Sequence, residues 1–196
     1  MKATSTVLAA AIAGLFSVTA SAQTAGSEVQ RDVNQQQRIE QGLKSGSLTT
    51  REASQLERSE AKIDKRESNA EKNGSLSPAE KARIQRAQNQ ESRNINRLES
   101  NGRNGNPDSA SSRRMQADVQ RNVNQERRVE QGVKSGQLTN REVGRLEGGE
   151  SRVDRAEARA GANGGVSAGE QKRIQSADNR QSRRIYRQKH DAQRRR

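Results

Sequence analysis

Few side chains in this sequence have the chemistry that an enzyme needs. The 196 residues contain no cysteine and one histidine, His190, close to the C-terminus. The sequence has no glycine-rich phosphate loop of the Walker or dinucleotide-binding type. Two carboxylate pairs, Glu60 with Asp64 and Glu150 with Asp154, have a four-residue spacing in stretches rich in arginine and lysine, which is typical of ion pairs on a helix surface. We therefore predict a protein that is not an enzyme and needs no cofactor.

Oxygen-bearing side chains gather in one short segment, residues 69–80. Gly74 stands at the sixth of its twelve positions and Glu80 at the twelfth. This spacing resembles part of an EF-hand calcium loop, and the resemblance implies a set of candidate metal ligands. They are Asn69, Glu71, Asn73 and Glu80. Three similar segments fit less well, because Arg159 or an apolar residue such as Leu43 falls at a ligand position. A helix cap needs the same spacing without a metal, so caps are the preferred interpretation.

Positive charge is concentrated at the C-terminus. Residues 171–196 contain ten basic and two acidic side chains, a net charge of +8. The candidate anion-binding residues are Lys172, Arg173, Arg180, Arg183, Arg184, Arg187, Lys189, Arg194, Arg195 and Arg196. Four of them, from Arg180 to Arg187, recur every three or four residues and would line one side of a helix. Such a face can follow an anionic polymer.

The elements that position these residues are marked by one phrase that occurs four times. It reads GSLTTRE at 46–52, GSLSPAE at 74–80, GQLTNRE at 136–142 and GGVSAGE at 164–170. The glycine can end a helix in the left-handed conformation, and the hydroxyl with the glutamate three residues later can form a capping box for the next helix. We therefore predict four corners, each between two helices.

The sequence also repeats as a whole. Shifted by 90 residues, positions 29–97 align with 119–187 without a gap, and 36 of the 69 pairs are identical. Within the first unit, apolar spacing predicts helices at about 28–43, 50–71 and 78–99. The predicted fold is all-α, with two tandem three-helix units at 28–98 and 116–187.

The apolar seam of the second predicted helix is interrupted by Glu60 and Glu67, which recur as Glu150 and Glu157. A buried carboxylate without a partner is unfavourable. Either these groups meet arginines, with Arg38, Arg128, Arg93 and Arg183 as candidates, or the seam is not buried in the monomer. The second alternative would leave a surface for a partner or for self-association.

The remaining segments have simpler compositions. Residues 1–22 resemble an export signal, with Lys2, an apolar run and Ala20-Ser-Ala22, so we expect a periplasmic or secreted protein without a transmembrane span. Residues 23–27 are predicted to be disordered, 99–115 to form a flexible linker, and 188–196 a basic tail.

The chain, and above all its ending SRRIYRQKHDAQ at 182–193, resembles a group of exported helical proteins of bacteria that has no established activity. This resemblance implies export and helices and says nothing of mechanism.

The sequence favours a non-enzymatic interaction protein that binds an anionic polymer or acidic surface through its basic C-terminal helix. Polysaccharide, lipopolysaccharide, DNA and an acidic protein are all admissible partners. With Tyr186 as the only aromatic residue after the expected signal, contacts with nucleic acid would be limited to the backbone. Two alternatives are a degenerate EF-hand-like protein that binds divalent cations and a hydrophilic structural or stress-protective envelope protein.

Overall fold

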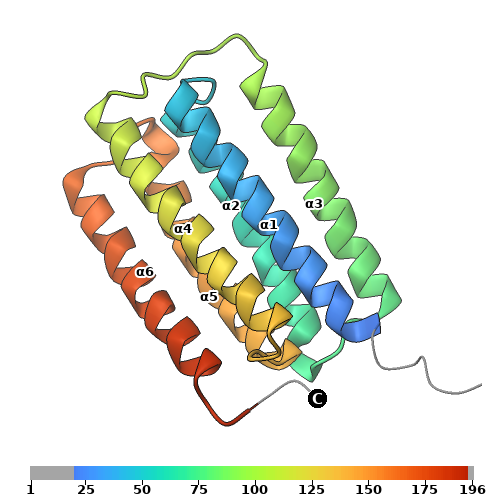
Figure 1. The fold of residues 1–196 in the computed structure, drawn as a ribbon. Helices are drawn as coiled ribbons and strands as arrows, with labels where there is room; N and C mark the ends of the chain where they lie inside the picture. Colours follow the sequence, from blue (N-terminus) through green and yellow to red (C-terminus); the bar gives the residue numbers. More distant parts are fainter. Residues whose placement is uncertain (1–19, 194–196) are drawn as a thin grey trace, which may run out of the picture.

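The chain folds into an all-helical bundle, as its pattern predicted. The computed structural model describes residues 20–193, and over that range it has six α-helices and no strand (Figure 1). The helices are α1 (Ala20–Ser45), α2 (Thr50–Ala70), α3 (Pro78–Glu99), α4 (Ala110–Lys134), α5 (Asn140–Ala160) and α6 (Ala168–Lys189), with 3₁₀ turns η1 (Glu71–Asn73) and η2 (Gly161–Asn163). None of the described helices is long and apolar enough to cross a membrane.

The four predicted corners are confirmed. Thr49, Ser77, Thr139 and Ser167 each accept a hydrogen bond from the backbone N–H of the glutamate three residues later, and that glutamate bonds back to the cap. The glycine that opens each phrase has a positive φ, between 70° and 92°. Only glycine adopts this conformation without strain, so the local sequence determines where each helix begins.

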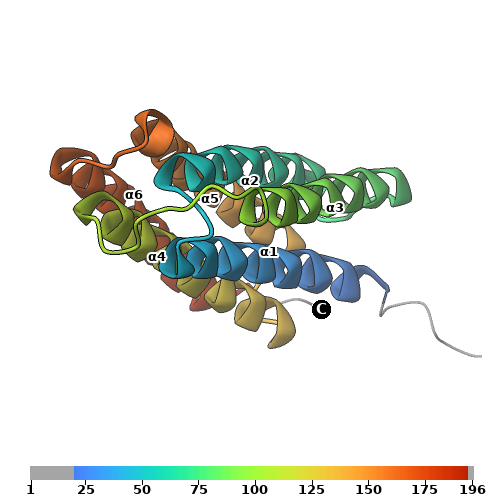
Figure 2. The same ribbon diagram turned by 90° about the horizontal axis from the view of Figure 1, so that it is seen from above.

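Four helices form the centre of the bundle, and two cover its edges. α2 packs against α5 and α1 packs against α4, in both cases with the chains running in opposite directions (Figures 1 and 2). α3 covers α1 and α2 at one edge, while α6 covers α4 and α5 at the other. The contact between the two halves is therefore made by their first and second helices.

Small residues let α2 and α5 approach each other closely. A Cβ added to Gly148 of α5 would lie 2.7 Å from the hydroxyl oxygen of Ser68 in α2, and one added to Gly144 would lie 3.3 Å from the Ser68 backbone oxygen. Midway along the pair, the Ser151 hydroxyl donates to the backbone oxygen of Ala61 at 2.7 Å. Side chains in the middle of either helix are thus held against the opposite helix.

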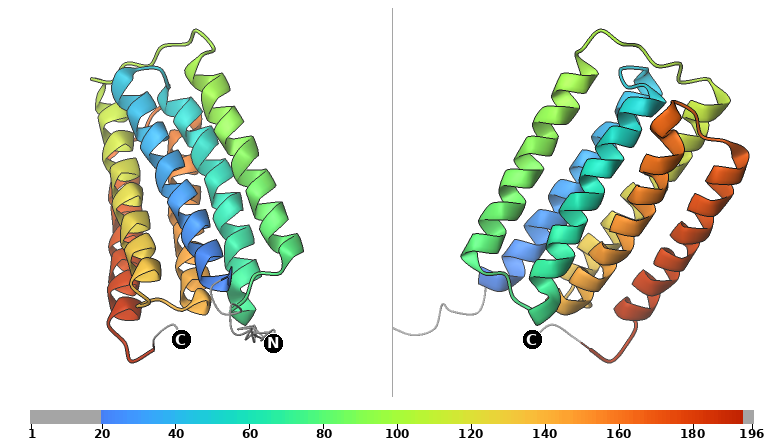
Figure 3. Two further views of the ribbon diagram at one scale, coloured as in Figure 1. Left: turned by 45° about the vertical axis from the view of Figure 1, so that its right-hand side comes forward. Right: turned by 180° about the vertical axis from the view of Figure 1, so that it is seen from behind.

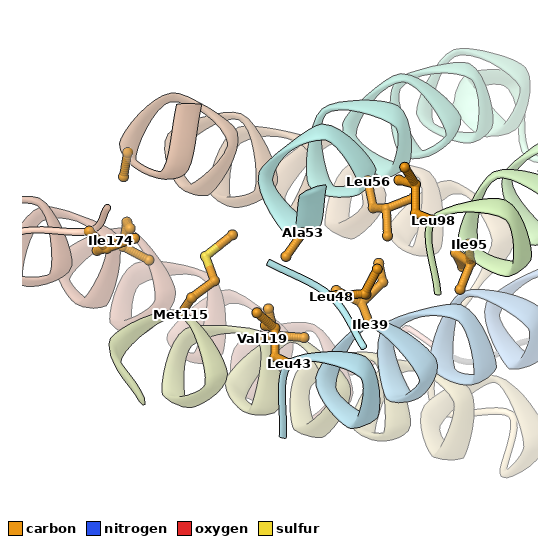
Figure 4. Close-up of a cluster of buried hydrophobic side chains, with 12 residues drawn as sticks. Ile39, Leu43, Leu48, Ala53, Leu56, Ile95, Leu98, Met115, Val119 and Ile174 are labelled. Carbon is orange, nitrogen blue, oxygen red and sulfur yellow. The ribbon is translucent and has the colours of Figure 1, made fainter. Parts of the chain in front are cut away.

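Apolar side chains form two separate clusters rather than one continuous core. The larger, drawn in Figure 4, contains Ile39, Leu43, Leu48, Ala53, Leu56, Ile95, Leu98, Met115, Val119, Ala160, Val166 and Ile174. The smaller contains Val29, Val129, Val133, Leu138, Val143, Leu146 and Ile185. The clusters use opposite ends of α1, α4 and α5, so they close the bundle at both ends and leave its middle to other residues.

The predicted segments outside the helices differ from the structure in two respects. Residues 23–27, expected to be disordered, lie in α1, where Ala25 is buried. The connection between α3 and α4, visible at one end of the bundle in Figure 3, is shorter than the expected linker because α4 begins at Ala110. Its Gly105 N–H donates to the Gly46 oxygen at 2.8 Å. Most of the expected signal, residues 1–19, lies outside the described residues.

Candidate metal centre

The acidic side chains of this basic protein lie inside it. Of its 24 aspartates and glutamates, 19 are buried, whereas Lys189 is the one buried base among the described residues. The acids that are not buried are Glu80, Glu99, Asp108, Glu170 and Asp191. An uncompensated charge in a protein interior is strongly unfavourable, so this core needs protons or cations to neutralise it.

The central helices supply most of these groups. In α2 they are Glu57, Glu60, Asp64 and Glu67, and in α5 they are Glu147, Glu150, Asp154 and Glu157. Steps of three, four and three residues keep all four groups on one face of a helix. Because α2 and α5 pack on each other, the two acidic faces meet in the middle of the bundle, between the two apolar clusters.

Neither alternative that the sequence offered for these glutamates is correct. The seam is buried, with Glu60 and Glu150 each 1% exposed, yet among the described residues no arginine forms an ion pair with it. Arg38 instead pairs with Glu99 at 2.7 Å. Arg128 donates to the Ser182 hydroxyl and Arg93 to Gln90, both near the surface. The long arginine side chains reach solvent more easily than a core already crowded by two facing helices.

The first group of carboxylates combines three helices. One oxygen from each of Asp32 in α1, Glu67 in α2 and Glu147 in α5 lies within 4.8 Å of the others. Glu147 is 1% exposed, and neither of its oxygens has a hydrogen-bond partner within residues 20–193. The Gln88 amide Nε2, from α3, donates to Asp32 Oδ1 at 2.9 Å and to Glu67 Oε1 at 3.1 Å. We name these four residues cluster A.

The second group is built in the same way. One oxygen from each of Glu57 in α2 and Asp154 and Glu157 in α5 lies within 4.8 Å of the others. The Asn122 amide Nδ2, from α4, donates to Glu157 Oε2 at 2.8 Å, and Gln36 Nε2 donates to Glu57 Oε2 at 3.1 Å. We name Glu57, Asp154, Glu157 and Asn122 cluster B.

Both clusters have the spacing that a cation requires. Oxygens that bind calcium lie about 2.3–2.6 Å from the ion, so ligands of one ion are at most about 5 Å apart. The three oxygens of each cluster satisfy this limit. All these donors are oxygen, the ligand type that hard cations prefer.

Burial makes the carboxyl groups hold their protons. It raises the pKa of Asp32 and that of Glu57 to about 7, and that of Glu150 to about 8. For Glu67 and Glu147, burial followed by the charge of neighbouring carboxylates raises the pKa well above its ordinary value. Asp154 and Glu157 are affected in the same way. In the absence of a cation, protons neutralise the core near pH 7.

Carboxyl groups also hydrogen-bond one another. Asp32 bonds to Glu67 in cluster A, and Glu57 bonds to Glu157 in cluster B. Between the clusters, Asp64 bonds to Asp154. Each such bond requires a proton on one of the two groups. A multivalent cation that replaced the protons would satisfy the same oxygens.

The predicted anion-binding residues fall into three classes. Six are exposed on α6: Lys172, Arg173, Arg180, Arg183, Arg184 and Arg187. Lys189 is buried, and its Nζ donates to Gln131 Oε1 at 3.2 Å. Arg194, Arg195 and Arg196 lie outside the described residues. The structure thus groups six of the ten on one outer helix.

The loop residues predicted as metal ligands have different environments in the structure. Glu80 Oε2 accepts from the Ser77 N–H at 2.9 Å and from its hydroxyl at 2.6 Å, as the capping box requires. Asn73 Oδ1 accepts from the Ser75 N–H at 3.0 Å. Asn69 is exposed, whereas Glu71 is buried. Capping accounts for the glutamate at the loop's last position.

Sequence reasoning identified neither cluster, although it noticed Glu67 and Glu157 as interruptions of a seam and Asp154 as part of a surface pattern of ion pairs. The signal was present as the spacing E-x-x-E-x-x-x-D-x-x-E, which occurs at 57–67 and again at 147–157. Arginines and lysines between these acids made the pattern resemble a surface of ion pairs. No protein-family model, curated protein or solved structure matches the chain, so the functional argument depends on the site itself.

Proposed function

We propose that this protein is a non-enzymatic binding protein that holds hard, multivalent metal cations among the buried carboxylates of its bundle. The observation that carries the proposal is Glu147, a fully buried carboxylate with no hydrogen-bond partner, placed within ligand distance of Asp32 and Glu67. Without a cation this group must keep its proton or remain an unsolvated charge. A bound cation would give its oxygens the partner they lack.

The donor set favours calcium or a trivalent ion of similar size. Copper and zinc prefer nitrogen or sulfur ligands, which the clusters do not offer. Magnesium demands near-ideal octahedral geometry and usually keeps several waters, while calcium accepts six to eight oxygens in irregular arrangements. Three carboxylates can also neutralise a trivalent ion fully. The apolar clusters close the bundle at both ends. This arrangement favours a protein that retains an ion over one that exposes the ion to a substrate.

The proposal includes the compartment and the repeat. Lys2, the apolar run and Ala20-Ser-Ala22 support export and cleavage near Gln23, which would place the protein in the periplasm or outside the cell. The 90-residue similarity supports two tandem three-helix units at 28–98 and 116–187. Extracellular calcium modules work at dissociation constants of about 0.1–1 mM, so an exported protein needs no extreme affinity.

Thermal unfolding of the full chain tests the cation proposal. After treatment with EDTA and dialysis at pH 7.5, Ca²⁺ or La³⁺ at about 100 times its dissociation constant should stabilise the fold by about 2.7 kcal/mol. For a chain of this size that raises Tm by roughly 5–10 °C. Mg²⁺ should have a smaller effect at the same concentration.

Two variants make the test specific. Glu147→Gln removes a ligand, so it should reduce the shift in Tm. Glu91→Gln is the matched control, because Glu91 is equally buried, lies outside both clusters and aligns with Gln181 at the 90-residue offset. An unchanged Tm for the wild-type chain in millimolar Ca²⁺ and La³⁺ would refute the proposal.

A second candidate function is binding of an anionic polymer by the outer face of α6. Arg183, Arg187 and Tyr186 line a groove on this helix together with Arg128 of α4. Tyr186 is the one large apolar side chain that is exposed among the described residues, at 58%. Its ring stacks on that of His190, with centroids 4.1 Å apart. An arginine-lined groove on a basic helix supports contact with phosphate or sulfate groups.

A further inference from the structure

We propose that each chain holds two cations, one in cluster A and one in cluster B, at positions that correspond through the 90-residue offset. The inference depends on the proposed function and extends it to the number of ions, their ligands and the origin of the second site. Each ion would be bound by carboxylates from both halves of the chain. Neither site would therefore exist in a single three-helix unit.

The two clusters share one arrangement of two glutamates, which the repeat forms twice. At the 90-residue offset, Glu67 aligns with Glu157, and Glu57 aligns with Glu147. Cluster A takes Glu67 from the first half and Glu147 from the second, whereas cluster B takes Glu157 from the second half and Glu57 from the first. Because α2 and α5 run in opposite directions, each aligned pair of glutamates is divided between the two ends of the acidic face.

Buried amides identify each cluster independently of its acids. Gln88 is fully buried and Asn122 is 1% exposed. Each donates its NH₂ group to the carboxylates of its cluster, while its amide oxygen has no hydrogen-bond partner. Rotation of the amide by 180° would point that oxygen at the cluster, where a cation would take the place of the hydrogen bonds given up.

The clusters differ at two aligned positions, one of which is Gln88 of cluster A, because it corresponds to Asp178 outside cluster B. Asp32 in cluster A corresponds to Asn122 in cluster B, and cluster B gains a third carboxylate from Asp154 instead. Asp154 is also hydrogen-bonded to Asp64, which lies between the clusters. Asp154 is therefore held by a group outside cluster B, whereas the hydrogen bond between Asp32 and Glu67 lies within cluster A. We expect cluster A to fill first.

Native mass spectrometry of the full chain can count the ions. The wild-type protein, treated with EDTA and titrated with La³⁺ alone at pH 7, should bind two ions in succession. Glu147→Gln and Glu57→Gln should each retain one ion, and the double variant should retain none. Glu91→Gln should still bind two. These substitutions replace a buried carboxyl group by an amide of the same shape, so the variants should fold, and circular dichroism before titration verifies it.

The alignment supplies a second pair of variants. Each one replaces a residue by the residue that stands at the aligned position of the other half. Asp32→Asn should weaken the first binding step at least tenfold, because it removes one of the three charged ligands of cluster A. Asn122→Asp should tighten the second step by a similar factor. Isothermal titration with La³⁺ measures both steps.

The possible failures can be told apart. A wild-type chain that binds a single ion, which either Glu147→Gln or Glu57→Gln abolishes, would replace the two sites with one shared site and leave the proposed function intact. A chain that binds no ion would overturn both proposals. Two ions that both persist in the double variant would overturn the assignment of ligands.

Discussion

At the scale of single residues, the unusual property of this protein is a set of carboxyl groups that are easier to protonate when it is folded. Glu57 and Glu150 illustrate it, since burial raises their pKa from 4.5 to about 7 and about 8. The unfolded chain exposes the same groups to water and returns them to ordinary values. Proton uptake is therefore linked to folding.

This linkage predicts that the metal-free protein loses stability as the pH rises. A group whose pKa is raised on folding contributes full stability below its unfolded pKa of about 4.5, and this is lost as the pH passes its folded pKa of about 7–8. A single group shifted from 4.5 to about 7 accounts for on the order of 3 kcal/mol. In EDTA, Tm should be higher at pH 5 than at pH 8.

The capping glutamates have the opposite effect on stability. They make the protein less stable as the pH falls, and only at a pH below that at which the core groups act. Hydrogen bonds from Ser77 and Ser167 lower the pKa of Glu80 and Glu170, so the stability that these two provide is lost below pH 4.5. Between pH 5 and 8 the core groups therefore decide the trend. A metal-free protein that is more stable at pH 8 than at pH 5 would show that its core carboxyls are charged and stabilised by something other than protons.

At the scale of elements, the sequence predicted each helix better than it predicted how the helices pack. Helix starts at Thr50, Pro78 and Asn140 follow from local capping chemistry, which needs no tertiary information. The contact between α2 and α5 depends on small residues such as Ser54, Ser68 and Gly148, and the sequence prediction did not use the four-residue spacing of Gly144 and Gly148. Without that contact, the acids of both helices resemble a solvated face.

The candidate site was missed for the same physical reason. Its ligands come from as many as four helices, and their meeting depends on the approach of α2 and α5 rather than on any local motif. Sequence reasoning recognised that Glu60 and Glu67 were costly to bury, but it considered only two outcomes, a nearby arginine that compensates or a seam that is not buried. When protons or a metal ion neutralise the buried carboxylates, no basic residue is needed for this, so the sequence contains no partner that would reveal the site.

Glycine substitutions test the close packing of these elements. Gly144→Ala should destabilise the fold by about 1–3 kcal/mol, because the new Cβ would meet Glu71 at 2.7 Å and force α2 and α5 apart. Gly169→Ala in the first turn of α6 has no atom within 4 Å of the added Cβ. It should be neutral or stabilising by up to about 1 kcal/mol.

Urea unfolding followed by circular dichroism compares the two variants. Equal stabilities would mean that α2 and α5 are not as close in solution as the structure places them. In that case, both clusters would also lose their shared geometry, because each takes a glutamate from α2 and another from α5.

At the scale of the whole molecule, charge is sorted by depth. The formal net charge of +13 understates the charge of the surface, because most acids lie inside and the bases, Lys189 apart, lie outside wherever the structure describes them. Exposed arginines occur on both edge helices, including Arg93 and Arg97 on α3 and Arg183 and Arg187 on α6. A surface of this kind attracts anionic polymers to all of its faces. One face binds the polymer preferentially only if its positive charges are arranged to match the polymer.

The aligned arginines allow the α6 groove to be distinguished from general surface charge. Arg183 and Arg187 correspond to Arg93 and Arg97 at the 90-residue offset, so two double variants, each with both arginines replaced by glutamine, remove the same charge from opposite edges. If the groove beside Tyr186 binds phosphate or sulfate groups, the α6 variant should elute from a heparin column at clearly lower salt than the wild type. The α3 variant should elute close to the wild type.

Each lost phosphate contact should also reduce the slope of log affinity against log salt for a DNA duplex by roughly 0.9. Equal losses for the two variants would mean that net charge alone draws the polymer to the surface, and the groove on α6 would have no special part in binding.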